Sequence, residues 1–201
     1  EGMNRFAWDL RYNEPIQIPG AFYSSNGPRG PLALPGDYQV KLTANGKTET
    51  ATLHLVIDPR TKDHEGDLPK QFDLSTQVTA RISELHRAVN EIRDVKSQIK
   101  ELHTKFGDDL KVKPALDAAD GMERKMSDVE QQLIQVNMKG SEGNLAFRNM
   151  LNEAFDTFSR SIDTGDREPT KPQLEVFASL SGRLDDQLKK WNAIKQDDLP
   201  K

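Results

Sequence analysis

Aromatic and polar residues alternate at the start of the chain. An extended segment over residues 6–12 would place Phe6, Trp8, Leu10 and Tyr12 on one face. This period of two predicts a half-buried β-strand. Residues 13–36 follow with five prolines and four glycines. That density is incompatible with regular structure and predicts a long loop.

A β-hairpin is predicted next, because Asn45-Gly46 is the sequence preferred by a two-residue type I′ turn. The turn pairs Ala44 with Lys47. The same register places three further pairs on one largely apolar face: Tyr38–Leu53, Val40–Ala51 and Leu42–Glu49. Leu55 and Ile57 extend this face, and Pro59 ends the strand because proline cannot donate a ladder hydrogen bond. Pattern and register therefore agree on an antiparallel unit.

The remainder of the chain has the period of helices. Residues 61–74 are polar, contain Gly66 and Pro69, and predict a connector. A long helix is expected from near Ser75 to Phe106, with Gly107 as its terminator. Its apolar seam shifts register once, between Ile92 and Val95. The seam consists of Val78, Ile82, Leu85, Val89 and Ile92, then Val95, Ile99, Leu102 and Phe106.

Three further helices are predicted. The second begins near Pro114, and Gly140 and Gly143 break it; its seam is Met122, Met126, Val129, Leu133 and Val136. The third covers about 144–162, with Phe147, Leu151, Ala154, Phe155, Phe158 and Ile162 on one face. The fourth starts with a capping box, Thr170 and Gln173, and its seam is Leu174, Phe177, Leu184, Leu188, Trp191 and Ile194. Short loops between amphipathic helices predict an up-and-down bundle of three to four helices over about 75–196, although the seams would also suit a partner helix.

Composition narrows the classes of function. The chain has 201 residues, of which 35% are hydrophobic and 30% charged. Its net charge is −4, and acidic and basic residues are interspersed along the chain. No basic stripe is present, which argues against a nucleic-acid partner. No apolar run reaches the roughly 20 residues of a membrane span. The absence of cysteine excludes disulfides and thiolate metal sites.

Two clusters of polar residues near the predicted sheet are candidate ligand sites. Trp8, Asp9 and Arg11 would suit a binding strand, but a core tryptophan beside an outward ion pair accounts for them. The acidic connector offers oxygen ligands for calcium, yet its spacing is not that of an EF-hand, so a solvated linker is favoured. Its polar residues are Asp58, Asp63, His64, Glu65 and Asp67.

The histidines form no recognisable site. His86 and His103 lie on one predicted helix, about 25 Å apart along its axis, which is too far for one metal. His54 and His64 lie elsewhere, and no Ser/His/Asp set, phosphate loop or paired carboxylate site is identifiable. The sequence therefore predicts no catalytic, cofactor-binding or metal-ligating residue.

The stretches NRFAWDLRY, LPGDYQVKLTANGKTETATLHLVIDPR and EVFASLSGRLDDQLKKWNAIKQDDLP carry a resemblance. They resemble the C-terminal region of exported bacterial sortilin-like β-propeller proteins with Asp-box (BNR) repeats, often labelled glycosyl hydrolases. The Trp-Asp strand, Pro-rich loop and Pro-Gly-x-Tyr strand also resemble the Ig-like domain of flagellar hook-capping proteins. The propeller repeats themselves are absent, so the resemblance transfers no catalytic residue.

The resemblance implies a periplasmic or extracellular location and a truncated Ig-like sandwich whose first strands would precede Glu1. The expected fold is α+β, with a small Ig-like antiparallel unit over 1–60, a polar linker over 61–74 and a helical bundle over 75–201. We expect a non-catalytic accessory module that supports the propeller of its parent chain or contacts another protein. The alternative is part of a hydrolase of glycans or peptides, in which loop 13–36 shapes a catalytic cleft formed upstream. A third possibility is a homo-oligomer formed through the long helix. The register shift in the apolar seam argues against it, because it interrupts a sustained heptad pattern.

Overall fold

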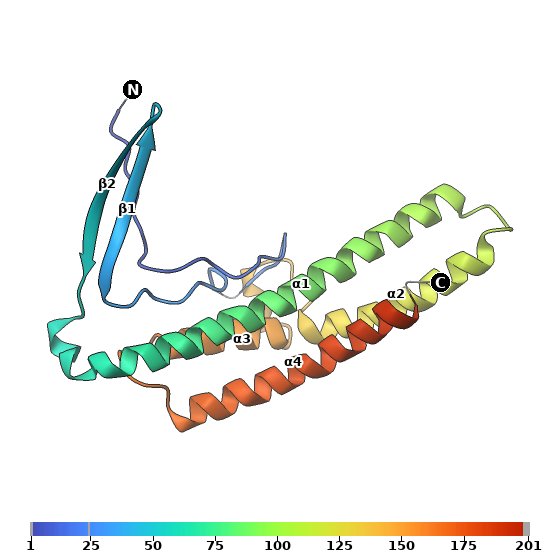
Figure 1. Ribbon diagram of the computed structural model, residues 1–201. Coiled ribbons are helices and arrows are strands. Elements are labelled where there is room, and N and C mark those ends of the chain that lie inside the picture. The colour runs from blue at the N-terminus through green and yellow to red at the C-terminus, as the bar shows by residue number, and fades with distance from the viewer. Residues whose placement is uncertain (1, 24, 199–201) are drawn as a thin grey trace.

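The computed structural model describes residues 2–23 and 25–198, without the side chain of Asn144. Its ordered elements are one two-stranded antiparallel sheet and four α-helices, joined by short 3₁₀ segments. Figure 1 shows the hairpin standing away from one end of an elongated helical bundle. The architecture is therefore α+β, with the two kinds of structure separated along the chain.

The hairpin consists of β1 (Gly36–Ala44) and β2 (Lys47–Leu55). Its register pairs Tyr38 with Leu53, Val40 with Ala51 and Ala44 with Lys47, as predicted. Asn45 and Gly46 have φ values of 51° and 77°, the positive values that a type I′ turn requires. The strand ends at Leu55, so Ile57 does not extend it.

The strand predicted over residues 6–12 is wrong. Within the described residues, this stretch makes only an isolated bridge between Arg11 and Leu32. Leu10 has a φ of 60°, which turns the backbone out of the extended conformation. Phe6 is 88% exposed, and of the four residues expected on the apolar face only Trp8 is half-buried, through an edge contact of its ring with Tyr38.

Helix α1 (Leu68–Phe106) is longer than predicted, and the expected polar connector over 61–74 is wrong from Leu68 onward, where α1 begins. Residues Pro59–Asp67 form a 3₁₀ helix that leads directly into α1. Pro69 lies in the first turn of α1, where its missing N–H removes no helical hydrogen bond. Polarity misled the prediction because Gln71 is buried here, with its amide donating to the carbonyls of Ile162 and Gly165.

Helices α2 (Lys113–Leu133) and α3 (Leu151–Ile162) follow one another along α1 and run antiparallel to it (Figure 1). Between them, residues 134–150 form an excursion that includes a short 3₁₀ helix, Ser141–Leu145, while Ile134 stays in the core. The third helix therefore begins at Leu151 and not near residue 144. Val136 and Phe147, predicted as seam residues, are exposed in this excursion.

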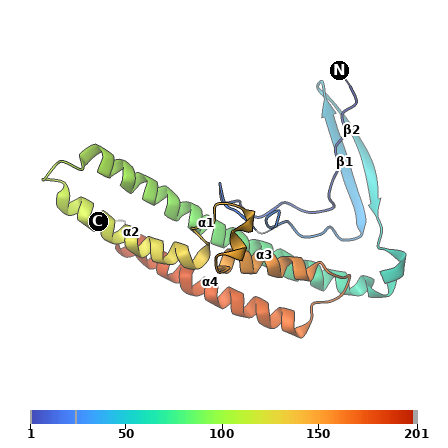
Figure 2. The ribbon, with the colours of Figure 1, turned by 180° about the vertical axis from the view of Figure 1, so that it is seen from behind.

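Helix α4 (Lys171–Asp197) returns along α2 and α3, as the view from behind shows (Figure 2). The predicted capping box is present, with Thr170 and Gln173 each accepting from the other's backbone. Leu174 is exposed, contrary to the predicted seam, because the first turns of α4 extend beyond the apolar core. The four helices thus form an up-and-down bundle in which α2 and α3, placed end to end, make up one of three parallel or antiparallel rows.

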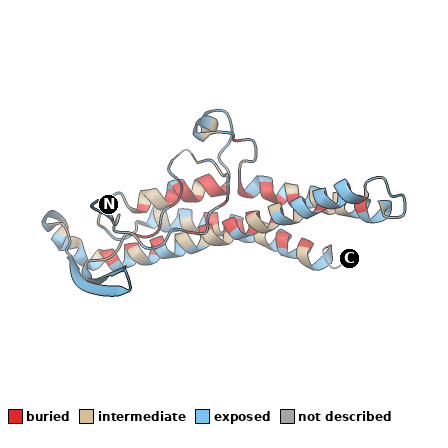
Figure 3. Ribbon diagram, turned by 90° about the horizontal axis from the view of Figure 1, so that it is seen from above, coloured by how far each residue is buried: buried red, intermediate tan, exposed pale blue. Residues whose placement is uncertain are grey.

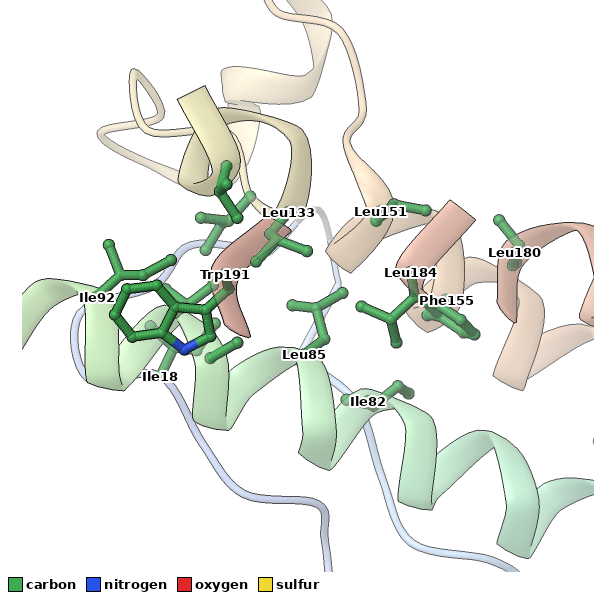
Figure 4. Close-up of a cluster of buried hydrophobic side chains, with 14 of the residues drawn as sticks. Ile18, Ile82, Leu85, Ile92, Leu133, Leu151, Phe155, Leu180, Leu184 and Trp191 are labelled. Carbon is green, nitrogen blue, oxygen red and sulfur yellow. The ribbon is translucent and has the colours of Figure 1, made fainter. Parts of the chain in front are cut away.

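Buried residues concentrate at the middle of the bundle (Figure 3). Figure 4 shows Trp191 and Leu184 of α4 packed against Leu85 and Ile92 of α1. Ile18, from the predicted loop, belongs to the same hydrophobic cluster. The loop is therefore part of the packing of the helices.

Candidate functional site

Residues 10–23 and 25–34, here called the arm, lie along the bundle (Figure 1). Ile18 is buried in the core, and Asn90 of α1 donates to the carbonyl of Gln17 at 2.9 Å. At the other end of the arm, Arg11 forms an ion pair with Asp163, just after α3, at 2.8 Å. Apolar and charged contacts thus fasten the arm to α1 and α3.

A polar cluster joins the arm to the bundle at its centre. Its members, the junction cluster, are Ser25, His86, Asn152, Asp156 and Arg160. The Ser25 hydroxyl donates to Asp156 Oδ2 at 2.6 Å and accepts from Arg160 Nη2 at 2.7 Å. His86 Nε2 lies 2.6 Å from Asn152 Oδ1, and Nδ1 contacts the carbonyl of Ile16.

The electrostatics of the junction cluster follow from its burial. His86 is fully buried, and the loss of hydration lowers its pKa despite the contacts with Ile16 and Asn152. Burial likewise raises the pKa of Tyr23, whose hydroxyl lies 3.4 Å from His86 Nε2, to about 12. Near neutral pH the centre of the cluster is therefore an uncharged imidazole beside an uncharged phenol.

The tautomer of His86 determines what this site can do. If Nδ1–H donates to the carbonyl of Ile16, Nε2 needs a donor. Rotation of the Asn152 amide lets Nδ2, which otherwise has no partner, donate to Nε2. Both imidazole nitrogens are then engaged, so His86 is not placed to take a proton from Ser25.

A polar stripe on α3 supplies three members of the cluster, none of which was expected from the sequence. Asn152, Asp156 and Arg160 recur at intervals of four residues and so share one face of the helix. That spacing beside an apolar face was the available signal. Ser25 gave no signal, because only the folding of the arm brings it to Asp156.

The second candidate is the hairpin face, formed by Tyr38, Val40, Leu42, Ala51, Leu53 and Leu55. The register places these side chains on one side of the sheet. Val40 is 50% exposed and Leu42 66%, and no residue of either strand is buried. The opposite face is polar and includes a hydrogen bond between the hydroxyls of Thr43 and Thr48. The hairpin is therefore apolar on one side, which the Trp8 ring covers in part at Tyr38 and which is open to solvent at Val40, Leu42 and Leu53.

The Trp8, Asp9 and Arg11 cluster expected from the sequence is held by local contacts: Trp8 Nε1 donates to the Arg11 carbonyl at 2.8 Å, and the Arg11 backbone N–H donates to Asp9 Oδ1 at 3.1 Å. An outward ion pair between Arg11 and Asp9 was expected. The Arg11 side chain instead points inward and pairs with Asp163. In the acidic connector, Asp58 is engaged by the Arg60 guanidinium and backbone N–H, which lower its pKa to about 2. Among the described residues, no group of three metal-ligating side chains comes together.

His103 pairs with Asp120 across α1 and α2 at 2.7 Å, far along α1 from His86. No helix in the described part of the chain is both long and apolar enough to cross a membrane.

Comparisons with protein-family models, with curated proteins and with solved structures returned no match for this chain.

Proposed function

We propose that this chain is a non-catalytic interaction module. In this proposal the hairpin face docks on a β-sheet of another domain or protein, and the helical bundle is the rigid base that carries it. The observation that supports the proposal is the exposure of Val40, Leu42 and Leu53 on one side of an isolated two-stranded sheet. Contiguous apolar surface of this kind is typical of interaction sites.

The energetics of the hairpin favour a covering partner. A two-stranded sheet has only marginal stability in water, and it gains stability when a third layer or strand covers its apolar side. Burial of each large apolar side chain contributes about 1.5–3 kcal/mol. Two sheets pack face to face about 10 Å apart, a geometry that would place a partner's apolar side chains between those of the hairpin face.

The resemblance to exported sortilin-like proteins suggests the identity of the partner. Under this proposal the covering surface is β-rich, either further strands of an Ig-like sandwich or the β-propeller of the parent protein. The location would be periplasmic or extracellular. The bundle would contribute no bond chemistry, and its role would be to hold the hairpin at a set angle.

A site-specific photo-crosslinker tests the proposal. With benzoylphenylalanine at Val40 in cells that make the protein, we expect a crosslink to one β-rich protein or domain. The purified partner is then titrated against the Val40→Lys/Leu42→Lys variant, whose Kd should rise at least about tenfold, since two apolar contacts worth about 1.4 kcal/mol or more are lost. Leu42→Lys faces Glu49, so the hairpin itself should remain paired.

The matched control changes the other face of the same strand. Gln39→Lys/Thr43→Lys adds the same charge to β1 but leaves the hairpin face intact. Its Kd should remain within about twofold of the wild-type value. Equal losses in both variants would contradict docking through the hairpin face.

The alternative, part of a glycan or peptide hydrolase, makes a different prediction. In that case the arm would supply residues to a cleft, and an active preparation would lose turnover when Ser25 is changed to alanine. Under the interaction proposal the chain, alone or with its partner, does not depend on Ser25 for any hydrolysis. Assays with chromogenic glycosides and peptides distinguish the two.

A further inference from the structure

A cavity of about 210 Å³ lies between the arm and the bundle, away from the hairpin face. Three elements line it: the arm, the first half of α1 and the end of α3. The lining side chains with polar ends are Arg11, Arg29, Ser75, Ser159, Arg160 and Asp163. Three guanidinium groups therefore face one space together with one carboxylate.

The charges in this cavity are not balanced. Arg11 uses Nη1 for Asp163 and for the carbonyl of Gly30, and Arg160 uses Nε and Nη2 for Asp156, Ser25 and Gly27. Arg29 has no hydrogen bond or ion pair with any described residue. One positive charge is thus left over, and guanidinium N–H donors of all three arginines remain available.

Ser75 is a second, independent indication. It interrupts the apolar seam of α1 between Leu74 and Val78, and the residue is only 7% exposed. Its hydroxyl has no partner among the described residues, although Ser75 lines the cavity. The hydroxyl is open to the cavity, so it is placed to donate a hydrogen bond to a ligand oxygen there.

A second cavity of about 160 Å³ adjoins the first and shares Ser75 and Asp163 with it. Most of its wall is apolar and includes Leu10, Leu68 and Phe72. Asp58 and Asp166 also line it, but Asp58 is paired with Arg60, and Asp166 accepts from the Thr61 hydroxyl. The two spaces together offer a cationic end and an apolar end. An amphipathic small molecule with an anionic head would match both.

We propose that these cavities bind a phosphate or sulfate monoester. Its oxyanion would lie among Arg11, Arg29 and Arg160 and accept from the Ser75 hydroxyl, and its apolar group would occupy the adjoining cavity. Donors arrive from three elements, which suits the several oxygens of a tetrahedral oxyanion better than the two of a carboxylate. Because the ligand would contact both the arm and α3, binding would also hold the arm on the bundle.

Calorimetric titration of the full chain tests this inference. The probes are phenyl phosphate, phenyl sulfate, inorganic phosphate and benzoate, all at one ionic strength set with sodium chloride. We expect 1:1 binding of a phenyl ester, with inorganic phosphate weaker and benzoate weakest. The preferred ester identifies phosphate or sulfate as the natural head group. No binding of either ester, or benzoate binding as tightly as the better one, would overturn the proposal.

Two variants and a control locate the site. Arg29→Gln should raise the Kd of the better ester at least about tenfold, since an ionic hydrogen bond contributes more than 1.4 kcal/mol, and its folding should be unaffected. Ser75→Ala should weaken binding in the same direction. Arg183→Gln removes an exposed arginine of α4 and should leave the Kd unchanged. Equal Kd values for wild type and Arg29→Gln, or equal losses in Arg29→Gln and Arg183→Gln, would show non-specific charge binding and refute the site.

Discussion

His86 is buried between the arm and α3, where protonation would place a charge among groups that include the carbonyl of Ile16 and the Asn152 amide. Asp156 raises the histidine pKa, but loss of hydration outweighs it, and the net pKa is lowered. The unfolded chain therefore binds a proton at a higher pH than the folded chain does. A stability that depends on pH follows from this difference.

We predict that the wild-type protein loses stability as the pH falls below about 6.5, the ordinary histidine pKa. The unfolded state takes up the proton first, so the free energy of unfolding decreases until the folded pKa is reached, by at most about 1.4 kcal/mol per pH unit. Urea denaturation between pH 7.5 and 5.5 measures this slope. His86→Gln should flatten it. Equal slopes for wild type and His86→Gln would contradict the prediction.

Glu130 is the buried anion at the contact between α1 and α2. Its carboxylate lies 2.8 Å from Arg93 Nε and 2.9 Å from Lys96 Nζ, and its side chain is 6% exposed. Neutralising a buried carboxylate leaves its two cations without a counter-charge. Both cations are partly hydrated, which reduces the cost.

Glu130→Gln should lower the free energy of unfolding by about 2 kcal/mol. The matched control is Glu175→Gln on α4, where the pair with Lys171 is 3.8 Å long and exposed. That change should cost less than about 0.5 kcal/mol. Chemical denaturation of the three proteins measures both, and equal losses would show that burial of Glu130 is unimportant.

At the scale of elements, the hairpin contributes a surface but no core. Neither strand has a buried residue, and Gly36 lies opposite Leu55 at its base. A Gly-Gly link in place of residues 37–54 should therefore close the gap without strain on the bundle. We expect the free energy of unfolding to change by less than about 1 kcal/mol, as measured by helical circular dichroism in urea. A loss above about 3 kcal/mol would mean that the hairpin packs on the bundle.

At the scale of the whole molecule, the arm links the N-terminal part of the chain to the helical bundle, and the stability of the bundle depends on it. Ile18 lies in the same cluster as Leu85 and Trp191, and Arg11 neutralises Asp163. Removal of residues 1–58 would expose this part of the core and leave Asp156 and Asp163 without their arm contacts.

A chain that starts at Pro59 should therefore be less stable than the full chain by more than about 3 kcal/mol. Ile18→Ala alone should cost about 2–4 kcal/mol, because it leaves a cavity. Circular dichroism in urea measures stability, and sedimentation equilibrium shows whether the exposed surface causes association. A truncated chain as stable as the full one, and monomeric, would contradict the role assigned to the arm.

Local chemistry explains which features were predictable from sequence. The turn at Asn45-Gly46 and the capping box at Thr170 depend on a few adjacent residues, so sequence predicted both, together with the hairpin register. The 3.6-residue period likewise predicted the four helices, because burial along a helix repeats with its turns. The predicted ends of helices were wrong where tertiary contacts outweighed the local pattern of polarity. Gln71 is polar yet buried in α1, and Phe147 is apolar yet exposed.

The candidate sites depended on contacts between distant parts of the chain. Sequence by itself determined the α+β class, the amphipathic helices and the apolar side of the hairpin, because propensity, turn chemistry and periodicity act over a few residues. Only the tertiary structure decided that the proline-rich arm lies on the bundle, that Arg11 meets Asp163 and Ser25 meets Asp156, and that the hairpin face stays open. The physical reason is that such contacts join segments with no shared local pattern, and they form only when burial of the core brings those segments together.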